Sequence, residues 1–507
     1  RWIAFAAEGE LFGTEINSTS RAYLDGFLPA LETLYQKDGI QFEEEVFTTA
    51  PGDSLYAQVL TLRVTNPGKI SRKAAFSLLM GRRKSAVAGH RRGPNGAGPS
   101  PMSFDPLVTG YRVDPGGMIV RNQAGEIVLC AEDPFQWGGP PRENRLTYEL
   151  LLGAGQSKEF YFIIPSTSAP VKDSAAVKTV NVKESRDKFR RYWQGMLEGK
   201  TRLDLPEQPL NDLYKNLLAQ AMIVLRDGQT LKYGAYWYED YFGLEEGWPI
   251  VALAQYGHRD QAQSAIEIML SPELMDKSNY HHQYRNGLGA MYASQVYRLT
   301  QDRQWLAAIR PRLIELAEWT VRTRRQTEGN SEEFRGLLPK HAYGGDISTP
   351  AYSLYSNATC WRGLQETGSL LRELGDTELA EKYLKDARDY RKVIDLVASK
   401  NTNRQVSPPF VPLAFDIGSA DSKDYKKVET PYPFIPSDPL GNYWILFAPL
   451  LLETGVFTAD SPSAQAMRDT MEQDGGLLAG LARFYRGVDH IYGFGYPLQL
   501  YEKGDRS

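Results

Sequence analysis

The chain has 507 residues, of which 42% are apolar, and a formal net charge of −4. This length and apolar content are enough to bury large cores and predict two or three domains. Lysines, arginines and acids are interspersed without long runs of one sign. That pattern excludes the electrostatic footprint typical of nucleic-acid binding and favours a neutral polar partner.

Few features of the sequence bear on compartment or metals. No run approaches the roughly 18 apolar residues of a membrane span, so no such span is predicted. Cys130 and Cys360 lie far apart and predict buried free thiols, not a disulfide or a cysteine metal site. The chain starts at Arg1 without a methionine or a signal peptide, which indicates processing or truncation. The compartment stays open, with a periplasmic or secreted location favoured over a cytoplasmic one.

Residues 1–170 are predicted to form an antiparallel β-sandwich. Short β-branched or alternating runs such as AQVLTLRVT, KAAFSLLM, GMIVRN, EIVLCAE and EFYFIIP are separated by NPG, DPGG, NQAG and GAGQS. Glycine, proline and asparagine in such clusters form turns, whereas the runs between them have strand composition. The sequence therefore predicts an all-β domain at the N-terminus.

Residues 171–205 are predicted to form a helical linker, and residues 206–507 a helical domain. The linker contains VKESRDKFRRYWQGMLEGK, an amphipathic helix that ends before PEQP. Some later helices have one apolar face, as in the segment that carries Leu379, Tyr383, Ala387, Tyr390, Ile394 and Val397. Others, such as YSLYSNATCWRGLQETGSLL, are apolar or small nearly all round. One-faced outer helices around fully buried inner helices predict two concentric rings.

Five junctions predict repeated helical hairpins. They lie at Gly257, Asp302, Gly375, Gly455 and Gly504. Glycine tolerates the left-handed conformation that closes a helix, and a following aspartate can cap the next one. We expect an (α/α)6 toroid of which five hairpins are present, with the domain incomplete at its C-terminus.

The loops that precede the inner helices are expected to converge on one cleft. The first, LKYGAYWYEDYFGLEEGWP, places ring-stacking surfaces beside acids that can bind hydroxyl groups. Its site candidates are Trp237, Tyr238, Glu239 and Asp240, with Glu245 and Glu246 further along. A core plug whose acids cap the next helix is the alternative.

Two further loops carry binding and catalytic candidates. DKSNYHHQYRNG contains Tyr284 and Arg285, and its adjacent histidines lack the i, i+4 spacing of a helical metal site, so no metal is predicted. In EGNSEEFRGLLPKHAYGGDISTP, Asp346 follows two glycines and lies near Tyr343. A carboxyl group there can act as a general acid if burial raises its pKa. A simple turn cap at Asp346 is the alternative.

The last two loops extend the predicted ring of aromatic, carboxylate and amide side chains. VETPYPFIPSDPLGNYW contributes Trp444, and FYRGVDHIYGFGYPL contributes Asp489 and Tyr492. Together with the earlier loops they exceed what a core alone requires. We therefore include these three residues among the substrate-binding candidates.

In layout the chain resembles the six-hairpin glycosidase superfamily. Bacterial glucoamylases, family 63-like α-glucosidases and sugar phosphorylases share its order of β-sandwich, helical linker and (α/α)6 barrel. AYWYEDYF is similar to the trehalase segment YYWDSYF, whose tryptophan and aspartate contact the sugar. The resemblance implies substrate contacts by Trp237 or Tyr238 and by Glu239, or by Asp240 in its place. By position it implies Asp346 as general acid, with the general base contributed beyond Ser507.

The resemblance implies an inverting glycoside hydrolase that acts on an oligosaccharide or polysaccharide and needs no cofactor. One carboxyl group protonates the leaving oxygen, and a second, roughly 6.5–9.5 Å away, activates water. Three alternatives stay open. A sugar phosphorylase would bind phosphate through Arg, Lys or His. A polysaccharide lyase would use a Tyr or His base and cations beside a uronate. A carbohydrate-binding scaffold would lack a working carboxylate pair.

Overall fold

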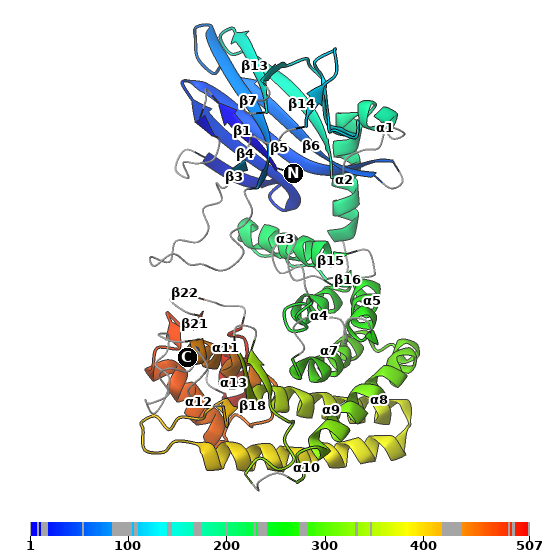
Figure 1. Cartoon of the computed structure of the whole chain (residues 1–507), viewed down its shortest axis with the longest axis vertical. Helices are drawn as coiled ribbons and strands as arrows, with labels where there is room; N and C mark the ends of the chain where they lie inside the picture. The colour runs from blue at the N-terminus through cyan, green and yellow to red at the C-terminus, as the bar shows by residue number, and fades with distance from the viewer. Residues whose placement is uncertain are drawn as a thin grey trace. The chain divides into compact units, whose positions relative to one another are not determined.

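A computed structural model describes most of the chain. The described ranges are 2–7, 10–11, 19–52, 55–83, 104–105, 110–138, 144–166, 174–197, 201–226, 230–231, 241–272, 282–329, 333–344, 347–417, 439–484, 487–488 and 492–504. The chain divides into two compact units, Arg1–Gln220 and Ala221–Ser507. The first contains the two large β-sheets and the second most of the helices (Figure 1).

Two antiparallel sheets form the first unit, which confirms the predicted N-terminal β domain. The larger sheet has the order β3 (Thr19–Leu24), β4 (Leu28–Lys37), β5 (Ile40–Gly52), β6 (Leu55–Thr65), β14 (Ser157–Pro165), β11 (Ile127–Ala131), β10 (Ile119–Arg121), β9 (Arg112–Val113). The smaller has the order β12 (Gln136–Gly138), β13 (Arg145–Leu152), β7 (Arg72–Arg83), β1 (Trp2–Ala7), β2 (Glu10–Leu11), with β8 (Phe104–Asp105) paired to β7.

Alternating side chains explain why these segments pair as sheets. In β6, Leu60, Leu62 and Val64 are buried, whereas the intervening Thr61 and Arg63 are more exposed. A strand places successive side chains on opposite faces, so the apolar set meets one core. Aromatic rings from both sheets fill that core: the ring of Phe76 on β7 lies 4.8 Å from that of Phe160 on β14.

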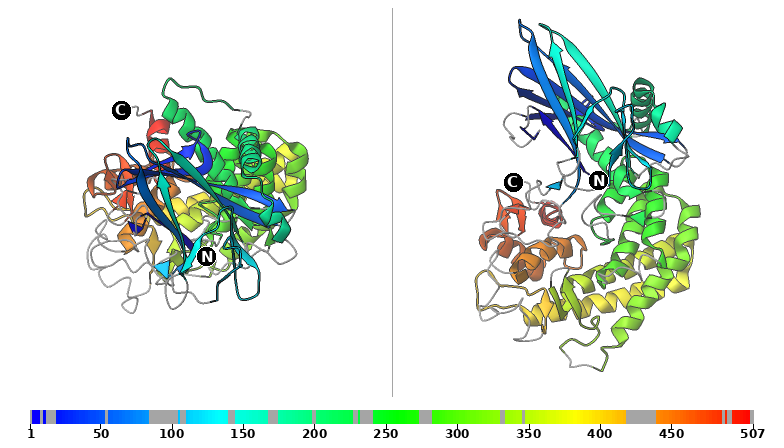
Figure 2. Two further views of the ribbon diagram at one scale, coloured as in Figure 1. Left: turned by 90° about the horizontal axis from the view of Figure 1, so that it is seen from above. Right: turned by 45° about the horizontal axis from the view of Figure 1, so that its top comes forward.

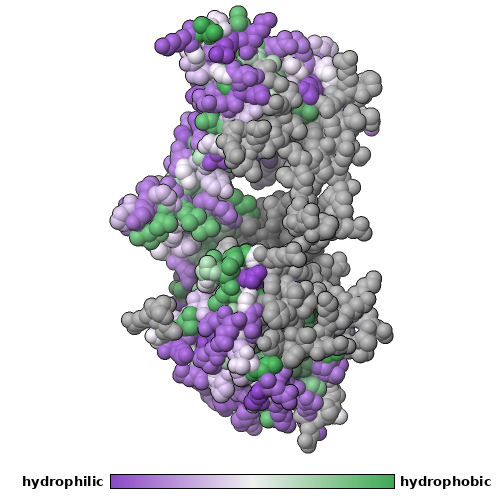
Figure 3. All heavy atoms as spheres, turned by 90° about the vertical axis from the view of Figure 1, so that its left-hand side faces the viewer, coloured by the Kyte–Doolittle hydropathy of each residue, from purple (hydrophilic) through white to green (hydrophobic). Residues whose placement is uncertain are grey.

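A helical segment follows the sheets, as the amphipathic pattern predicts. It comprises α1 (Ser174–Lys178), α2 (Val182–Leu197) and α3 (Gln208–Val224). Phe189 of α2 packs on Phe47 of β5 with ring centroids 5.7 Å apart. Leu210, Leu213 and Leu217 are 46–50% exposed and lie along one side of α3. The space-filling view shows apolar side chains at the height of this helix (Figure 3).

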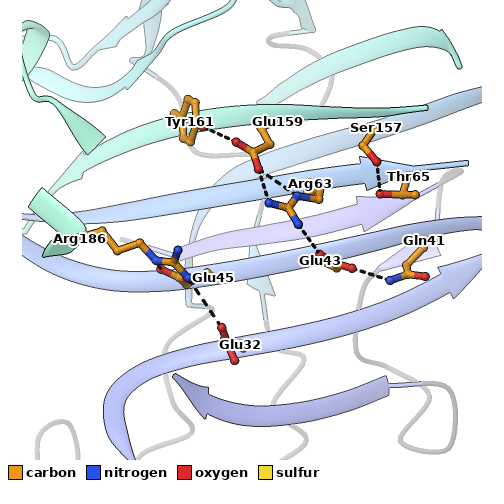
Figure 4. A network of polar contacts seen from close by, with 10 residues as sticks. All are labelled: Glu32, Gln41, Glu43, Glu45, Arg63, Thr65, Ser157, Glu159, Tyr161 and Arg186. Atoms are coloured by element: carbon orange, nitrogen blue, oxygen red, sulfur yellow. Dashed lines mark hydrogen bonds and ion pairs between the residues drawn. The ribbon is translucent and has the colours of Figure 1, made fainter. Parts of the chain in front are cut away.

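A polar network on the larger sheet fastens α2 to the strands (Figure 4). The Arg186 guanidinium of α2 pairs with the Glu45 carboxylate of β5. Arg63 of β6 bridges Glu159 of β14, at 2.5 Å, and Glu43 of β5, at 3.6 Å. These pairs cross strands on a partly solvated face, where each contributes little by itself but fixes the orientation of its side chain.

The second unit consists of helices that follow one another as hairpins. They are α4 (Gly247–Gln255), α5 (Arg259–Met269), α7 (Tyr284–Thr300), α8 (Arg303–Arg325), α9 (Leu354–Leu374), α10 (Thr377–Asn401), α11 (Pro439–Glu453), α12 (Pro462–Gln473) and α13 (Gly495–Lys503). Short strands join them: β15 (Leu225–Arg226), β16 (Thr230–Leu231), β17 (His341–Gly344), β18 (Ile347–Ser353), β19 (Ala414–Phe415), β20 (Leu477–Leu478), β21 (Leu481–Phe484) and β22 (Gly487–Val488).

Alternate helices form a continuous inner row. Helix α7 packs against α4 and α9, and α11 packs against α9 and α13, while α8 and α10 pack against α9 from outside. Both views in Figure 2 show the long green and yellow helices side by side. Helix α9 is buried nearly all round, whereas α10 buries one stripe and exposes the rest. The helical C-terminal domain is thereby confirmed, while closure into six hairpins stays a prediction.

The predicted helix junctions have the expected backbone conformations. Gly257, Gly375, Gly455 and Gly504 all have positive φ, between 70° and 89°. At the remaining junction Gln301 adopts the left-handed conformation instead, and the Asp302 carboxylate accepts the N–H groups of Gln304 and Trp305. The glycines thus end their helices and Asp302 begins α8.

Three further predictions concern membrane spans, thiols and metal sites in the described residues. Within them, no helix is long and apolar enough to cross a membrane. Cys130 and Cys360 are free thiols, Cys360 fully buried and Cys130 partly so. Among the same residues, no group of three His, Cys, Asp or Glu side chains is placed to hold a metal ion.

Candidate functional site

The candidate site begins in the loop that leads into α4. The Glu246 carboxylate accepts the backbone N–H groups of Phe242, at 3.1 Å, and Gly243, at 2.7 Å. Gly243 has a φ of 90°, a conformation that side-chain-bearing residues rarely adopt. The loop therefore curls around its own carboxylate, and Glu246 is only 1% exposed.

Helix α7 holds this loop from the other side. The Arg285 guanidinium donates from Nε to the carbonyl oxygen of Phe242, at 3.1 Å, and from Nη2 to that of Tyr241. Its charged carbon lies 5.3 Å from the centroid of the Tyr241 ring. Arg285 is 2% exposed, so these contacts replace the water that a guanidinium otherwise requires.

Two further acids come together at the start of α4. Trp248 donates its indole N–H to the Glu453 carboxylate at the end of α11, at 3.3 Å. Tyr492, which precedes α13, donates its hydroxyl to the Glu245 carboxylate at 2.8 Å. The rings of Trp248 and Tyr492 lie 6.2 Å apart. Residues more than 200 positions apart in the chain thus form one cluster, which we call the acid cluster: Glu245, Glu246, Trp248, Glu453 and Tyr492.

Burial alters the acidity of two members of the acid cluster. Desolvation raises the pKa of Glu246 to about 7, with the neighbouring Glu245 carboxylate adding to the effect and backbone N–H groups opposing it. Desolvation also raises the pKa of Glu453 to about 7, against the opposing influence of the Trp248 hydrogen bond and the Arg362 charge. Each carboxyl group is therefore partly protonated at neutral pH.

Tyrosines surround the acid cluster with a largely apolar wall. Desolvation raises the pKa of Tyr292 and Tyr355 well above the ordinary value, so both are neutral hydroxyls. Tyr355 stacks on Phe447 with ring centroids 4.8 Å apart, and Tyr292 donates to the carbonyl oxygen of Leu244 at 3.3 Å. Such an environment keeps a carboxylic acid protonated, as general acid catalysis near neutral pH requires.

Six of the predicted site residues lie outside the described residues. They are Asp346, the proposed acid, together with Trp237, Tyr238, Glu239, Asp240 and Asp489. Strands β17 and β18 flank Asp346 in the sequence, and a packing contact fixes the end of β17. A Cβ atom added at Gly344 would lie 2.5 Å from the Tyr443 ring, so only glycine permits this approach.

The other predicted site residues are described, and four of them are buried. Tyr284 and Arg285 lie in the first turn of α7, 7% and 2% exposed. Tyr343 in β17 is 1% exposed and packs against Phe447, with ring centroids 5.4 Å apart. Trp444 is 2% exposed and donates its indole N–H to the Val411 carbonyl at 2.8 Å. Of the five, Tyr492 retains partial exposure and joins the acid cluster. Substrate contact by each stays a prediction.

Glu453 is the site residue that sequence reasoning missed. It belongs to LLLETGVF, which the pattern assigns to the end of an inner helix just before Gly455. A carboxylate at such a position normally reaches solvent. The signal in the sequence is the apolar run WILFAPLLL immediately before it, which indicates a helix that is enclosed up to its end.

The β17–β18 region is anchored by one buried amide. The Asn357 side chain accepts the Leu338 N–H at 2.9 Å and the Tyr390 hydroxyl at 2.6 Å, and donates to the Ser353 carbonyl at 2.7 Å. Asn357 is 1% exposed, so its side chain acts as a structural amide. This contact fixes the segment that leads into β17 on α9.

A larger groove, of about 740 Å³, lies on the β-sandwich and has a different chemistry. Its carboxylates include Glu43, Glu45 and Glu159, which are tied to Arg63 and Arg186 in the network described above. The paired carboxylates orient the strands and α2, whereas desolvation raises the pKa of Glu44 in the same groove to about 7. The acid cluster differs because it holds two such carboxyl groups within a wall of buried tyrosines, so the helical unit holds the better candidate site.

Comparison with solved structures shows the fold. A bacterial glucoamylase complexed with acarbose is similar over 93% of this chain and 72% of its own, at 11% identity and a TM-score of 0.55. A GH78 family rhamnosidase of Bacillus sp. GL1 (11% identity, 91% and 41% covered, TM-score 0.41) and the GH92 family glycosyl hydrolase ccman5 (12%, 87% and 57%, 0.33) overlap too loosely to add to this.

Sequence comparison adds no closer relation. No protein-family model matches, and a search of curated proteins finds no match. The structural similarity to the glucoamylase extends over both the β-sheet unit and the helical unit. The chain therefore shares the fold of this glucoamylase, an N-terminal β domain followed by paired helices, as the resemblance to the six-hairpin glycosidases implies.

Proposed function

We propose that this chain is a glycoside hydrolase that cleaves an oligosaccharide or polysaccharide with a carboxyl acid–base pair. The observation that carries the proposal is the acid cluster: two carboxyl groups with pKa values raised to about 7 lie within an aromatic wall. A proton donor to a glycosidic oxygen needs this kind of raised pKa. The similarity to a glucoamylase fold agrees with the same chemistry.

Glu453 is the proton donor that the described geometry favours. Its residue is half-buried, whereas Glu246 is 1% exposed and committed to two backbone N–H groups. The indole N–H of Trp248 orients one carboxylate oxygen and leaves the other for a proton. Glu246 then acts by holding the loop in place and raising the local negative charge.

Glu245 is the corresponding candidate for the carboxylate that activates water. The Tyr492 hydroxyl orients it, and the adjoining Trp248 and Tyr492 rings place it beside Glu453. An inverting reaction requires the two carboxyl groups roughly 6.5–9.5 Å apart, with water between the base and the anomeric carbon. The segment that precedes Glu245 in the sequence would bind sugar hydroxyls and ring faces through Trp237, Tyr238, Glu239 and Asp240.

Asp346 is the rival proton donor, proposed from its place before the third inner helix. Leaving-group dependence separates the two. Protonation matters for an alkoxide leaving group but little for a strongly acidic phenol, so removal of the true acid should spare activated aryl glycosides. We expect Glu453→Gln to lower kcat on oligosaccharides about 100-fold or more, and to lower it much less on dinitrophenyl glycosides.

The experiment measures reducing-sugar release and aryl-glycoside cleavage with and without phosphate. Asp346→Asn is compared directly, and Glu373→Gln, an exposed carboxyl on α9, is the matched control. If Asp346→Asn alone shows the leaving-group signature, the acid is Asp346. Activity in the wild-type protein that none of the variants changes would refute the acid cluster as the catalytic centre.

A further inference from the structure

The end of α11, which carries Glu453, is held by side chains of two neighbouring helices. The last carbonyl groups of a helix have no N–H partners within that helix. Arg362 of α9 donates from Nη1 to the carbonyl oxygen of Thr454 at 3.0 Å. Gln499 of α13 donates to the carbonyl oxygen of Leu452 at 3.3 Å. The two bonds therefore fix the backbone on both sides of Glu453.

Arg362 approaches this helix end closely because the chain turns there at a glycine. Gly455 has a φ of 70°, a conformation that side-chain-bearing residues rarely adopt. A Cβ atom added to it would lie 3.3 Å from Nη1 of Arg362, which is a tight contact. The guanidinium thus lies against the two residues that follow Glu453 in the chain.

The charge of Arg362 is only partly neutralised. Its Nη2 pairs with the Glu366 carboxylate at 2.7 Å, but the same carboxylate also pairs with Arg298 of α7. One negative charge shared by two guanidinium groups leaves an excess of one positive charge. The Arg362 side chain is 25% exposed, and its buried Nε–H has no acceptor among the described residues. The excess charge is therefore poorly screened by solvent on the side of α11.

Glu453 is the acid on which this excess charge acts. Desolvation raises the pKa of Glu453 to about 7, and both the Trp248 hydrogen bond and the Arg362 charge oppose that rise. The Trp248 bond is made by a neutral indole, whereas Arg362 brings a full charge. Among the described residues, Arg362 is thus the cation that favours the ionised form of Glu453.

The other ionisable side chains around Glu453 differ from Arg362. Burial keeps Tyr292 of α7 and Tyr355 of α9 neutral, and Glu245 before α4 accepts the Tyr492 hydroxyl. The charged side chains of the remaining elements packed against α11 bind partners of their own: Arg468, Asp469 and Glu472 of α12, Arg483 of β21, and Glu502 and Lys503 of α13.

We propose that Arg362 is a positioning residue for the proton donor Glu453: it fixes the end of α11 and stabilises the ionised carboxylate. Glu366 then determines how much of the Arg362 charge acts on Glu453. A proton donor must give up its proton and regain it in each cycle, so a carboxyl group that could not ionise would not turn over. This inference rests on the proposed hydrolase activity and adds to it the group that balances the burial of Glu453.

The two partners of the Arg362–Glu366 pair should shift the pH profile in opposite directions. Arg362→Gln removes the positive charge, so the alkaline loss of kcat/KM should occur about one pH unit higher than in the wild type. Glu366→Gln leaves more of the Arg362 charge uncompensated, so the same loss should occur at lower pH. Arg362→Lys keeps the charge and should stay near the wild type. Arg372→Gln, which breaks an exposed ion pair on the same helix, is the matched control.

Differential scanning calorimetry tests the same coupling without an activity assay. The stability that the Glu453 proton confers is lost as pH rises through its folded pKa. In Arg362→Gln the fall in Tm should therefore extend about one pH unit further into the alkaline range. In a Glu453→Gln background, Arg362→Gln should leave the pH dependence of Tm unchanged.

The two assays separate this inference from the proposed hydrolase activity. A calorimetric shift in Arg362→Gln without any dependence of activity on Glu453 would overturn the role of Glu453 as proton donor and keep the coupling to Arg362. Coincident pH profiles of Arg362→Gln and the wild type would overturn the inference. If Arg362→Gln does not fold, Glu366→Gln decides, because a shift to higher pH or no shift at all contradicts the coupling.

Discussion

The buried Glu453 carboxyl should make the helical unit less stable at neutral pH than in mild acid. Desolvation raises its pKa from 4.5 to about 7, so between these values the folded chain holds a proton that the unfolded chain releases. The stability that this proton confers is fully present below pH 4.5 and is lost as pH rises through 7. Glu453→Gln removes the titration and preserves an oxygen for the Trp248 N–H.

The size of the effect follows from the pKa difference. Each pKa unit corresponds to about 1.4 kcal/mol, and between pH 5 and pH 8 the linkage relation gives a loss of about 2 to 3 kcal/mol. At about 2 cal/mol/K per residue, the unit Ala221–Ser507 unfolds with an entropy of about 0.6 kcal/mol/K. The carboxyl should therefore account for about 4 °C of the fall in Tm over this interval.

Differential scanning calorimetry at pH 5, 6, 7 and 8 measures this contribution. Relative to wild type, Glu453→Gln should show a Tm that falls about 4 °C less from pH 5 to pH 8, whereas the exposed control Glu373→Gln should follow the wild type. If Tm depends on pH in Glu453→Gln as it does in the wild type, the pKa of Glu453 in the folded chain is not raised. Glu453 would then lack the raised pKa that a proton donor needs.

Two predictions test the packing of the inner helices. Glu366 is 2% exposed and pairs with Arg298 of α7, so Glu366→Gln should destabilise the unit by about 3 kcal/mol, measured as a lowered Tm. A Cβ atom at Gly287 would lie 2.1 Å from the Thr359 carbonyl oxygen, so Gly287→Ala should force α7 from α9 and cost about 3 kcal/mol or more. A Tm within 1 °C of the wild type would contradict either one.

Local signals made the fold predictable from the sequence. Gly257 and Gly375 adopt the positive φ that their place after an apolar run implies, and Asp302 caps α8 as expected. The stripe of Tyr383 and Tyr390 on α10 is buried on one face. These features depend on neighbours three or four positions away, so periodicity and turn chemistry carry the information.

The site was less predictable because its members meet only through the tertiary fold. The loop before α4 was identified by its aromatic and acidic content, but its partner Glu453 is contributed by the far end of another inner helix.

The contrast between two acids in the helical unit bears on which of them has a chemical role. Glu366 accepts the Ser294 hydroxyl at 2.6 Å and pairs with arginines of α7 and α9, so its charge is met on every described side. Glu453 accepts one indole N–H, and neither this bond nor the Arg362 charge offsets its desolvation. Burying a carboxyl group whose charge is not compensated costs stability. A glutamine at the same position would avoid that cost. A destabilising acid beside stacked aromatic rings is best explained by the proton it carries.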